Sequence, residues 1–334
     1  MKKLAMISAL ALAVAAFTSS AFAADPVRLQ LKWSADAQFA GYYVAAAKGF
    51  YKDANLDVTI KAGGPDIAPE TVIAGGGADV IVDWMAAALS AREKGVALVN
   101  IAQPYKSSGL LLTCRNDMGV KTTADFKGKT LGVWFFGNEY PFYAWMAKLG
   151  IPTDGGANGV NVLKQNFNVD PLIQKQAACI STMSYNEYGQ VLDAGLKPDE
   201  LTVFNYRDQG VGMLEDGLYV MQDKLKDPAF QDKMARFVAA SMKGWDYAVA
   251  HPDEAAQIVV DADDSGAATL DHQKFMMEGV AKLIDSGNAA LNDDDYKQTV
   301  ATLLASSKND SNPAITKEPD AGAFTHEITD KVKM

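Results

Sequence analysis

Residues 27–61, VRLQLKWSADAQFAGYYVAAAKGFYKDANLDVTIK, contain the pattern that predicts the fold. Val27–Lys32 alternates between apolar and polar residues, which predicts a strand. Ala37–Lys48 has helical spacing and stops at Gly49, and Leu56–Lys61 predicts a second strand. A strand, a helix and a strand in this order predict parallel strands joined by a helical crossover.

The same alternation continues along the chain. Further strands are expected at Ala78–Val82, Val96–Ala102, Leu110–Cys114, Lys129–Trp134, Val160–Phe167, Ala178–Thr182, Leu201–Asn205 and Asp216–Met221. Helices are expected at Pro69–Ala74, Trp84–Lys94, Thr123–Phe126, Pro141–Leu149, Asp170–Ala177, Ser184–Ala194, Phe230–Ala250, Pro252–Asp261, Asp271–Ser286 and Asp293–Ala305. The polar stretch after Ser306 predicts an irregular segment over the surface. We therefore expect an α/β fold with mostly parallel sheets.

This order of elements predicts two α/β lobes between which the chain crosses twice. The crossings are expected near Thr113–Asn116 and Arg207–Gly212. Residues 24–113 and 212–334 would then form the first lobe with its C-terminal helices, and residues 114–211 the second. Because ligands of open α/β sheets bind beyond the carboxyl ends of the strands, we expect the site in the cleft between the lobes.

The N-terminus has the features of a cleavable secretory signal. Lys2 and Lys3 precede an apolar run, Leu4–Phe17, and Ala21-Phe22-Ala23 fits the small-residue cleavage pattern. The run is shorter than the roughly 20 residues that a membrane-spanning helix needs. We expect residues 1–23 to be removed and the mature protein to be soluble in the periplasm, without stable membrane insertion.

The composition excludes several classes of site. The 334 residues carry 41 Asp and Glu against 31 Lys and Arg, a formal charge of −10, which argues against a nucleic-acid groove. The three histidines, His251, His272 and His326, all lie in the last third, so the first two thirds hold no histidine-based catalytic or metal site. We expect no metal site, no cofactor and no catalytic triad.

The two cysteines leave two alternatives. Cys114 and Cys179 either pair in an oxidising compartment or are both buried as small apolar residues. The sequence does not place their Cα atoms, and the prediction favours two buried thiols.

Several motifs resemble one family of transport proteins. They are Leu31-Lys32-Trp33, Gln38–Ala45, Lys48–Tyr51, Leu56–Val58, Gly63–Pro65, Ala74–Asp79, Asp125–Lys129 and His251–Ala255. In order and spacing they resemble the periplasmic solute-binding proteins of ABC importers for thiamine pyrimidine precursors, which are relatives of the nitrate, sulfonate and taurine binders. The resemblance implies a two-lobed periplasmic-binding-protein fold of type II, a monomer, and permease and ATPase partners in the membrane.

The chain departs from one branch of that family. A eukaryotic branch makes the thiamine pyrimidine and consumes its own active-site histidine in the first lobe. No histidine precedes His251 here, and Cys179 stands alone where that branch has a cysteine-rich stretch. A pyrimidine-synthase-like enzyme is therefore disfavoured, and a non-enzymatic binding protein is expected.

The candidate ligand contacts lie at predicted strand ends, where aromatic and polar residues occur together. They are Trp33, Gln38, Phe39, Tyr42, Asp83, Trp84, Gln103, Tyr105, Trp134, Phe135, Asn138, Glu139, Tyr185, Asn186 and Glu187. Aromatic faces suit a planar ring, and polar groups suit its edge. The alternative is that these aromatics belong to the core.

The expected ligand is a small planar heterocycle. Because the candidate residues include Asp83 and Glu139 but few Lys or Arg, they favour a neutral or cationic ring over a nitrate- or sulfonate-type anion. A hydroxymethyl- or formylamino-pyrimidine fits best, and riboflavin or another heterocycle is the alternative. Glu139 is expected to accept a hydrogen bond from the ring edge.

Overall fold

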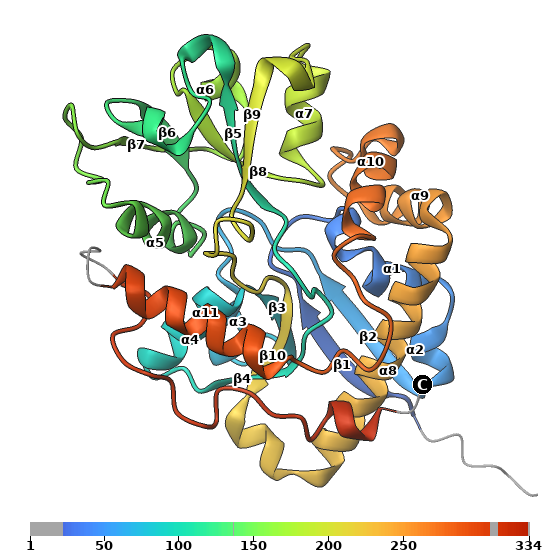
Figure 1. The fold of residues 1–334 in the computed structure, drawn as a ribbon. Coiled ribbons are helices and arrows are strands. Elements are labelled where there is room, and N and C mark those ends of the chain that lie inside the picture. The colour runs from blue at the N-terminus through green and yellow to red at the C-terminus, as the bar shows by residue number, and fades with distance from the viewer. Residues whose placement is uncertain (1–22, 136, 308–312, 333–334) are drawn as a thin grey trace, which may run out of the picture.

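The computed structural model describes residues 23–135, 137–307 and 313–332, so the expected signal sequence lies almost wholly outside the described residues. The chain forms two five-stranded sheets, each covered by helices, and Figure 1 shows the second sheet with its helices standing above the first. The first sheet has the order β2-β1-β3-β10-β4. Its strands are β1 (Asp25–Gln30), β2 (Leu56–Lys61), β3 (Val80–Asp83), β4 (Leu98–Ala102) and β10 (Gly217–Met221).

The second sheet repeats this arrangement in the order β7-β6-β8-β5-β9. Its strands are β5 (Leu110–Arg115), β6 (Thr130–Val133), β7 (Asn161–Lys164), β8 (Cys179–Met183) and β9 (Leu201–Asn205). In each sheet one strand, β10 or β5, is antiparallel to both of its neighbours. The α/β fold is confirmed, but the sheets are mixed and not mostly parallel, because two of the four strand pairs in each sheet are antiparallel. The two antiparallel strands are those on which the chain returns to the first sheet and enters the second.

The helices cover both sheets and extend the first lobe at its C-terminal end. They are η1 (Ala37–Phe39), α1 (Ala40–Ala47), α2 (Phe50–Asp53), α3 (Pro69–Ala74), α4 (Met85–Glu93), α5 (Tyr140–Leu149), α6 (Asp170–Ile173), α7 (Glu187–Asp193), α8 (Pro228–Ala250), α9 (Pro252–Ala262), α10 (Leu270–Val280) and α11 (Asp293–Ser306), with short 3-10 turns η2 (Asn116–Met118), η3 (Thr123–Phe126), η4 (Pro198–Glu200), η5 (Gln222–Lys226) and η6 (Thr329–Lys331). Local signals explain many of the ends: α5 has Pro141 in its first turn and the left-handed Gly150 (φ 66°) after its last. Among the described residues, no helix is both long and apolar enough to cross a bilayer.

The first crossing lies earlier than Thr113–Asn116. β5 is paired with β9 from Leu111 to Arg115 and with β8 from Leu110 to Cys114, so the chain is already inside the second sheet at Leu110. The connection between the sheets is therefore residues 103–109. The second connection runs from β9 to β10, residues 206–216, a range that contains Arg207–Gly212.

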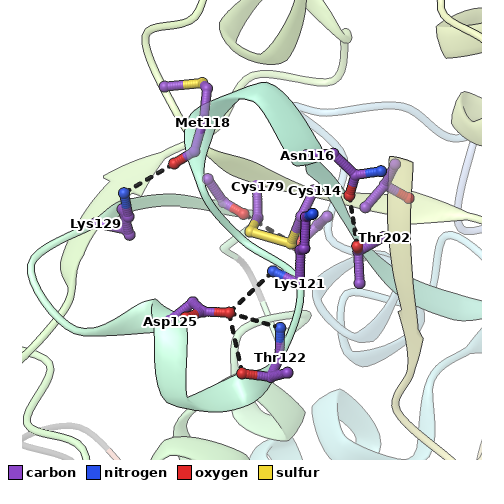
Figure 2. Close-up of a disulfide and its surroundings, with 12 residues drawn as sticks. Cys114, Asn116, Met118, Lys121, Thr122, Asp125, Lys129, Cys179 and Thr202 are labelled. Atoms are coloured by element: carbon purple, nitrogen blue, oxygen red, sulfur yellow. Dashed lines mark hydrogen bonds between the residues drawn. A yellow bond between two sulfur atoms is a disulfide. The ribbon is translucent and has the colours of Figure 1, made fainter. Parts of the chain in front are cut away.

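The expectation of two buried thiols is wrong, because Cys114 and Cys179 form a disulfide. β5 and β8 are antiparallel with Cys114 directly opposite Cys179, and their Cα atoms lie 3.9 Å apart. Figure 2 shows the bond beside the turn in which Asp125 accepts hydrogen bonds from Lys121 and Thr122. Two cysteines 65 positions apart are brought together by strand register, which is a property of the tertiary fold.

The C-terminal segment closes one edge of the first sheet. Phe324 forms a parallel bridge with Asn100 of β4, and the backbone of Asn100 donates to Ala323 and accepts from Thr325 at 3.0 Å each. Ala314, Ile315 and Ile328 of the same segment are buried. The expectation of a segment that lies over the surface is confirmed.

Contacts outside the strands also join the lobes. α11 of the first lobe packs along α5 of the second, and the buried side chain of Tyr140 belongs to a cluster with Met85, Leu89 and Leu303 of the first lobe. On the other side, His272 of α10 shares a 2.8 Å hydrogen bond with Asn186, directly before α7. The lobes are thus in contact on both sides of the two connections.

Candidate ligand-binding site between the lobes

A narrow slot lies between the lobes, at the carboxyl ends of strands from both sheets. The first lobe contributes Lys32, Trp33, Gln38 and Trp84, and the second contributes Trp134, Asn138, Phe167, Met183, Tyr185, Asn186 and Glu187. Its free volume is about 50 Å³. Since one water needs roughly 10–15 Å³ in this measure, the slot as it stands has room for a few water-sized groups.

Three aromatic rings from both lobes fill most of the slot. The Phe167 ring lies 4.4 Å from the Trp33 ring, centroid to centroid, and 6.1 Å from the Trp134 ring. The planes of Phe167 and Trp134 differ by 25°, so these two rings are stacked. The Trp33 plane is tilted by 52° from that of Phe167, so the stack belongs to the second lobe and Trp33 of the first lobe contacts it at an angle. Aromatic faces from both lobes are therefore available to a planar ring.

Glu187 supplies an acceptor at the edge of the slot. It is the first residue of α7, and its side chain is 7% exposed. Its carboxylate accepts from the Met183 backbone N–H at 2.9 Å and from the Asn186 side-chain amide at 3.1 Å. Burial raises the pKa of Glu187 to about 7. A donor on a bound molecule would meet a carboxyl group that is already oriented by two hydrogen bonds.

The first-lobe wall of the slot rests on buried carboxylates. Lys32 forms a 2.7 Å ion pair with Asp83, which is fully buried, and Gln38 donates to Asp216 at 2.7 Å. Burial opposes the charge on Lys32, but Asp83 keeps the pKa of the ammonium above its ordinary value. Burial raises the pKa of Asp216 to about 7. The charge of Lys32 in the slot lining is therefore balanced by Asp83, which lies outside the slot.

The two connections between the lobes are bonded to each other and to the slot. Glu215 of the second connection accepts from the Ser108 hydroxyl and from the Gly109 backbone N–H of the first. Tyr105 of the first connection donates to the backbone carbonyl of Gln38 at 2.7 Å. Burial raises the pKa of Glu215 to about 8. Gln38 thus contacts both connections, through Tyr105 and Asp216, and also lines the slot.

Eight of the fifteen candidate residues line the slot: Trp33, Gln38, Trp84, Trp134, Asn138, Tyr185, Asn186 and Glu187. Seven do not line it. Phe39 and Tyr42 lie in the core of the first lobe, where Tyr42 packs edge-on against Trp245 at 5.7 Å. Asp83 lies behind Lys32, and Gln103 and Tyr105 are buried in the first connection.

Phe135 and Glu139 are the two remaining candidates outside the slot. Phe135 packs beneath the ammonium of Lys164, 5.7 Å from its ring centroid. Glu139 is buried, and its carboxylate accepts from the backbone N–H of Gly137 at 2.8 Å, which holds the loop before α5. The carboxyl group that lines the slot is that of Glu187 and not that of Glu139.

Three slot residues were absent from the candidates: Lys32, Phe167 and Met183. Each lies at or just beyond the carboxyl end of a strand, which is the same signal that points to the other candidates. The sequence predicts a strand that extends to Phe167, but β7 ends at Lys164, and residues 165–169 form a loop that places the Phe167 ring next to both tryptophans. Among the described residues, no group of three His, Cys, Asp or Glu side chains is placed to hold a metal ion.

Residues 36–255, more than half of the chain, match the family described as NMT1/THI5 like. The chain belongs to this family. The formylaminopyrimidine-binding protein of Halalkalibacterium halodurans is 22% identical over 72% of this chain and 72% of its own length. The riboflavin-binding protein RibY of Chloroflexus aurantiacus is 26% identical over 69% of this chain and 64% of its own length.

Solved structures show the same fold. The periplasmic aliphatic sulphonate binding protein SsuA of Escherichia coli superposes with a TM-score of 0.63 and 12% identity, covering 85% of this chain and 88% of that one. The family resemblance and the two-lobed fold expected from the sequence are both confirmed. This member of the NMT1/THI5-like family carries its aromatic slot between the two sheets.

Proposed function

We propose that this chain is the extracytoplasmic binding component of an ABC importer and that it captures a pyrimidine precursor of thiamine, of the hydroxymethyl or formylamino kind. The observation that carries the proposal is the aromatic cluster of Trp33, Phe167 and Trp134 in the same slot as the buried carboxyl group of Glu187. The name of the Halalkalibacterium relative supports the same ligand class.

The slot chemistry matches an aminopyrimidine. Trp33 and Trp134 offer faces to a flat ring, and Glu187 offers an acceptor to an exocyclic amine or a ring N–H. Since the free volume is about 50 Å³, a ring enters only when Phe167 moves aside or the lobes separate. Hinge closure around a ligand is the usual motion of two-lobed binding proteins, and the two connections supply the hinge.

The wall chemistry is unfavourable for a nitrate- or sulfonate-type anion. Lys32 is already paired with Asp83, and the described slot lining contains no arginine. An anion placed there would also face the acceptor oxygens of Glu187, which costs binding energy. These features support a neutral or cationic ring.

A binding role is also favoured over catalysis. None of the described residues that line the slot is Ser, Thr, Cys or His, so this lining offers no serine, threonine or cysteine nucleophile and no imidazole base. The nearest histidine in the described hydrogen-bond network, His272, is bonded to Asn186. The proposal therefore includes permease and ATPase partners that carry out transport.

Native mass spectrometry of the protein purified from its own cells, followed by calorimetric titration, tests the proposal. The titration panel is hydroxymethylpyrimidine, formylaminopyrimidine, riboflavin, an alkanesulfonate and nitrate. We expect the two pyrimidines to bind at least tenfold more tightly than either anion, and to be released unchanged. Tight binding of an anion with no binding of either pyrimidine would overturn the assignment.

A further inference from the structure

A second, larger cavity lies directly beside the slot. Its volume is about 630 Å³, within the roughly 300–1,000 Å³ typical of small-molecule sites. We name it the chamber. Lys32, Trp33, Asn138 and Phe167 line both the slot and the chamber, so the two cavities adjoin along these four side chains. A ring enters the slot only when Phe167 moves or the lobes separate, and either movement would also open the slot toward the chamber.

We propose that the chamber is a second subsite, which binds an uncharged, hydroxyl- or amide-rich chain attached to the ring that occupies the slot. The inference rests on the proposed function, because it takes the planar ring in the slot as given. It adds that the preferred ligand is larger than a bare hydroxymethylpyrimidine.

One wall of the chamber is a face of α4 with small side chains. Ala87, Ser90 and Ala91 line the chamber, and Lys94 follows them one turn later on the same face. Small residues at these positions leave the space open. A further part of the lining is the loop of residues 64–68 together with residues 69–71, the first turn of α3.

One polar atom where the slot and the chamber meet lacks a partner among the described residues. The side-chain oxygen of Asn138 is buried without a hydrogen bond at the point where the slot meets the chamber. Ser90 is 6% exposed and lines the chamber. A donor on the chain would satisfy the Asn138 oxygen, which is already desolvated, and Ser90 adds a hydroxyl to the chamber wall.

The charges of the chamber favour an uncharged chain. Its lining has two acids, Asp66 and Glu70, and two lysines, Lys32 and Lys94. Lys32 is already paired with Asp83, and burial together with the charge of Asp83 raises the pKa of Glu70 above its ordinary value. A phosphate ester would add a further negative charge beside these carboxyl groups, whereas hydroxyl and amide groups would add none.

Calorimetric titration with three probes tests the subsite. The probes share one ring: hydroxymethylpyrimidine, its phosphate ester, and 4-amino-5-aminomethyl-2-methylpyrimidine acylated with gluconic acid. For the unmodified protein we expect the gluconamide to bind about tenfold more tightly than hydroxymethylpyrimidine, from two to three additional hydrogen bonds. The phosphate ester should bind more weakly than either.

Variants that fill the chamber separate it from the slot. Ile67 lines the chamber and is 40% exposed, so Ile67→Trp adds bulk without disturbing the core. Val203 on β9 is 39% exposed and outside both cavities, so Val203→Trp is the matched control. We expect Ile67→Trp to remove the tenfold preference for the gluconamide while hydroxymethylpyrimidine binds within twofold of normal, and Val203→Trp to change neither.

The possible outcomes distinguish failure of the chamber subsite from failure of the proposed function. Equal affinity of the unmodified protein for the gluconamide and hydroxymethylpyrimidine, or a preference that persists in Ile67→Trp, would overturn the subsite and leave the pyrimidine-binding function intact. Tighter binding of the phosphate ester would overturn the uncharged character of the chain. Failure of all three probes to bind would overturn the proposed function and the subsite with it.

Discussion

Glu187→Gln is the substitution that most directly tests the polar edge of the slot. The carboxylate of Glu187 accepts from the Met183 backbone N–H at 2.9 Å and from the Asn186 amide at 3.1 Å, and we propose that it also accepts from the ligand. An amide keeps the shape but replaces one acceptor oxygen with an NH₂ group. One of the three donors must then face another donor.

The cost follows from that mismatch. A buried polar group left without a partner costs about 1–3 kcal/mol, which corresponds to a tenfold to hundredfold loss of affinity. Stability should change less, because the substitution also removes a carboxyl group whose burial raises its pKa to about 7. We expect the melting temperature to shift by less than about 4 °C.

Glu139→Gln is the matched control for this experiment. Glu139 is 8% exposed against 7% for Glu187 and also accepts from a backbone N–H, but it lies outside the slot lining. Titration of hydroxymethylpyrimidine into both variants, with melting curves, gives the comparison. Normal affinity in Glu187→Gln, or an equal loss in Glu139→Gln, would refute the role of Glu187.

Three further measurements follow from the structure. Burial raises the pKa values of Glu187, Glu215 and Asp216 to about 7 or 8, so near neutral pH the folded state retains protons that the unfolded chain has lost. The free energy of unfolding, measured by chemical denaturation, should therefore fall as pH rises from 5 to 8. The Glu215→Gln variant should show a shallower fall. Cys114→Ser opens the loop that the disulfide closes across 65 positions and should lower the free energy of unfolding by about 2–4 kcal/mol in urea denaturation. Reduction of the unmodified protein should give the same loss, and reduction of Cys114→Ser should cause no further loss. Trp33→Ala should weaken pyrimidine binding at least tenfold in calorimetry with little change in melting temperature, because Trp33 is only partly buried; a large drop in melting temperature with normal affinity would instead make it a core residue.

Periodicity was a good guide to the elements and a weaker guide to their ends. The expected strand Leu56–Lys61 and helix Pro69–Ala74 have the same bounds in the structure, since each is bordered by turn residues. The helix expected over Asp271–Ser286 ends at Val280. Beyond it, the backbone of Leu283 accepts from Lys106 of the first connection, a tertiary contact that the local pattern does not contain.

For the candidate site too, the local sequence predicted some features, and others depend on tertiary structure. Candidates at strand ends line the slot where the chain continues as a loop, as at Trp33 and Trp134. Phe39 and Tyr42 were not, because a helix that leaves the same strand end directs its aromatic side chains into the core. Strand register, which pairs Cys114 with Cys179, was likewise beyond the sequence pattern.

The bridge between Phe324 and Asn100 has a consequence for the order in which the two lobes can fold. All five strands of the second sheet come from one continuous stretch, residues 110–205, whereas the first sheet needs β10 and then the C-terminal segment beside β4. A chain that emerges N-terminus first can therefore finish its second lobe while its first lobe still has an open edge. An exposed edge strand pairs readily with other chains. Loss of the last twenty or so residues would accordingly leave ligand contacts in place and yet produce a protein that self-associates through β4.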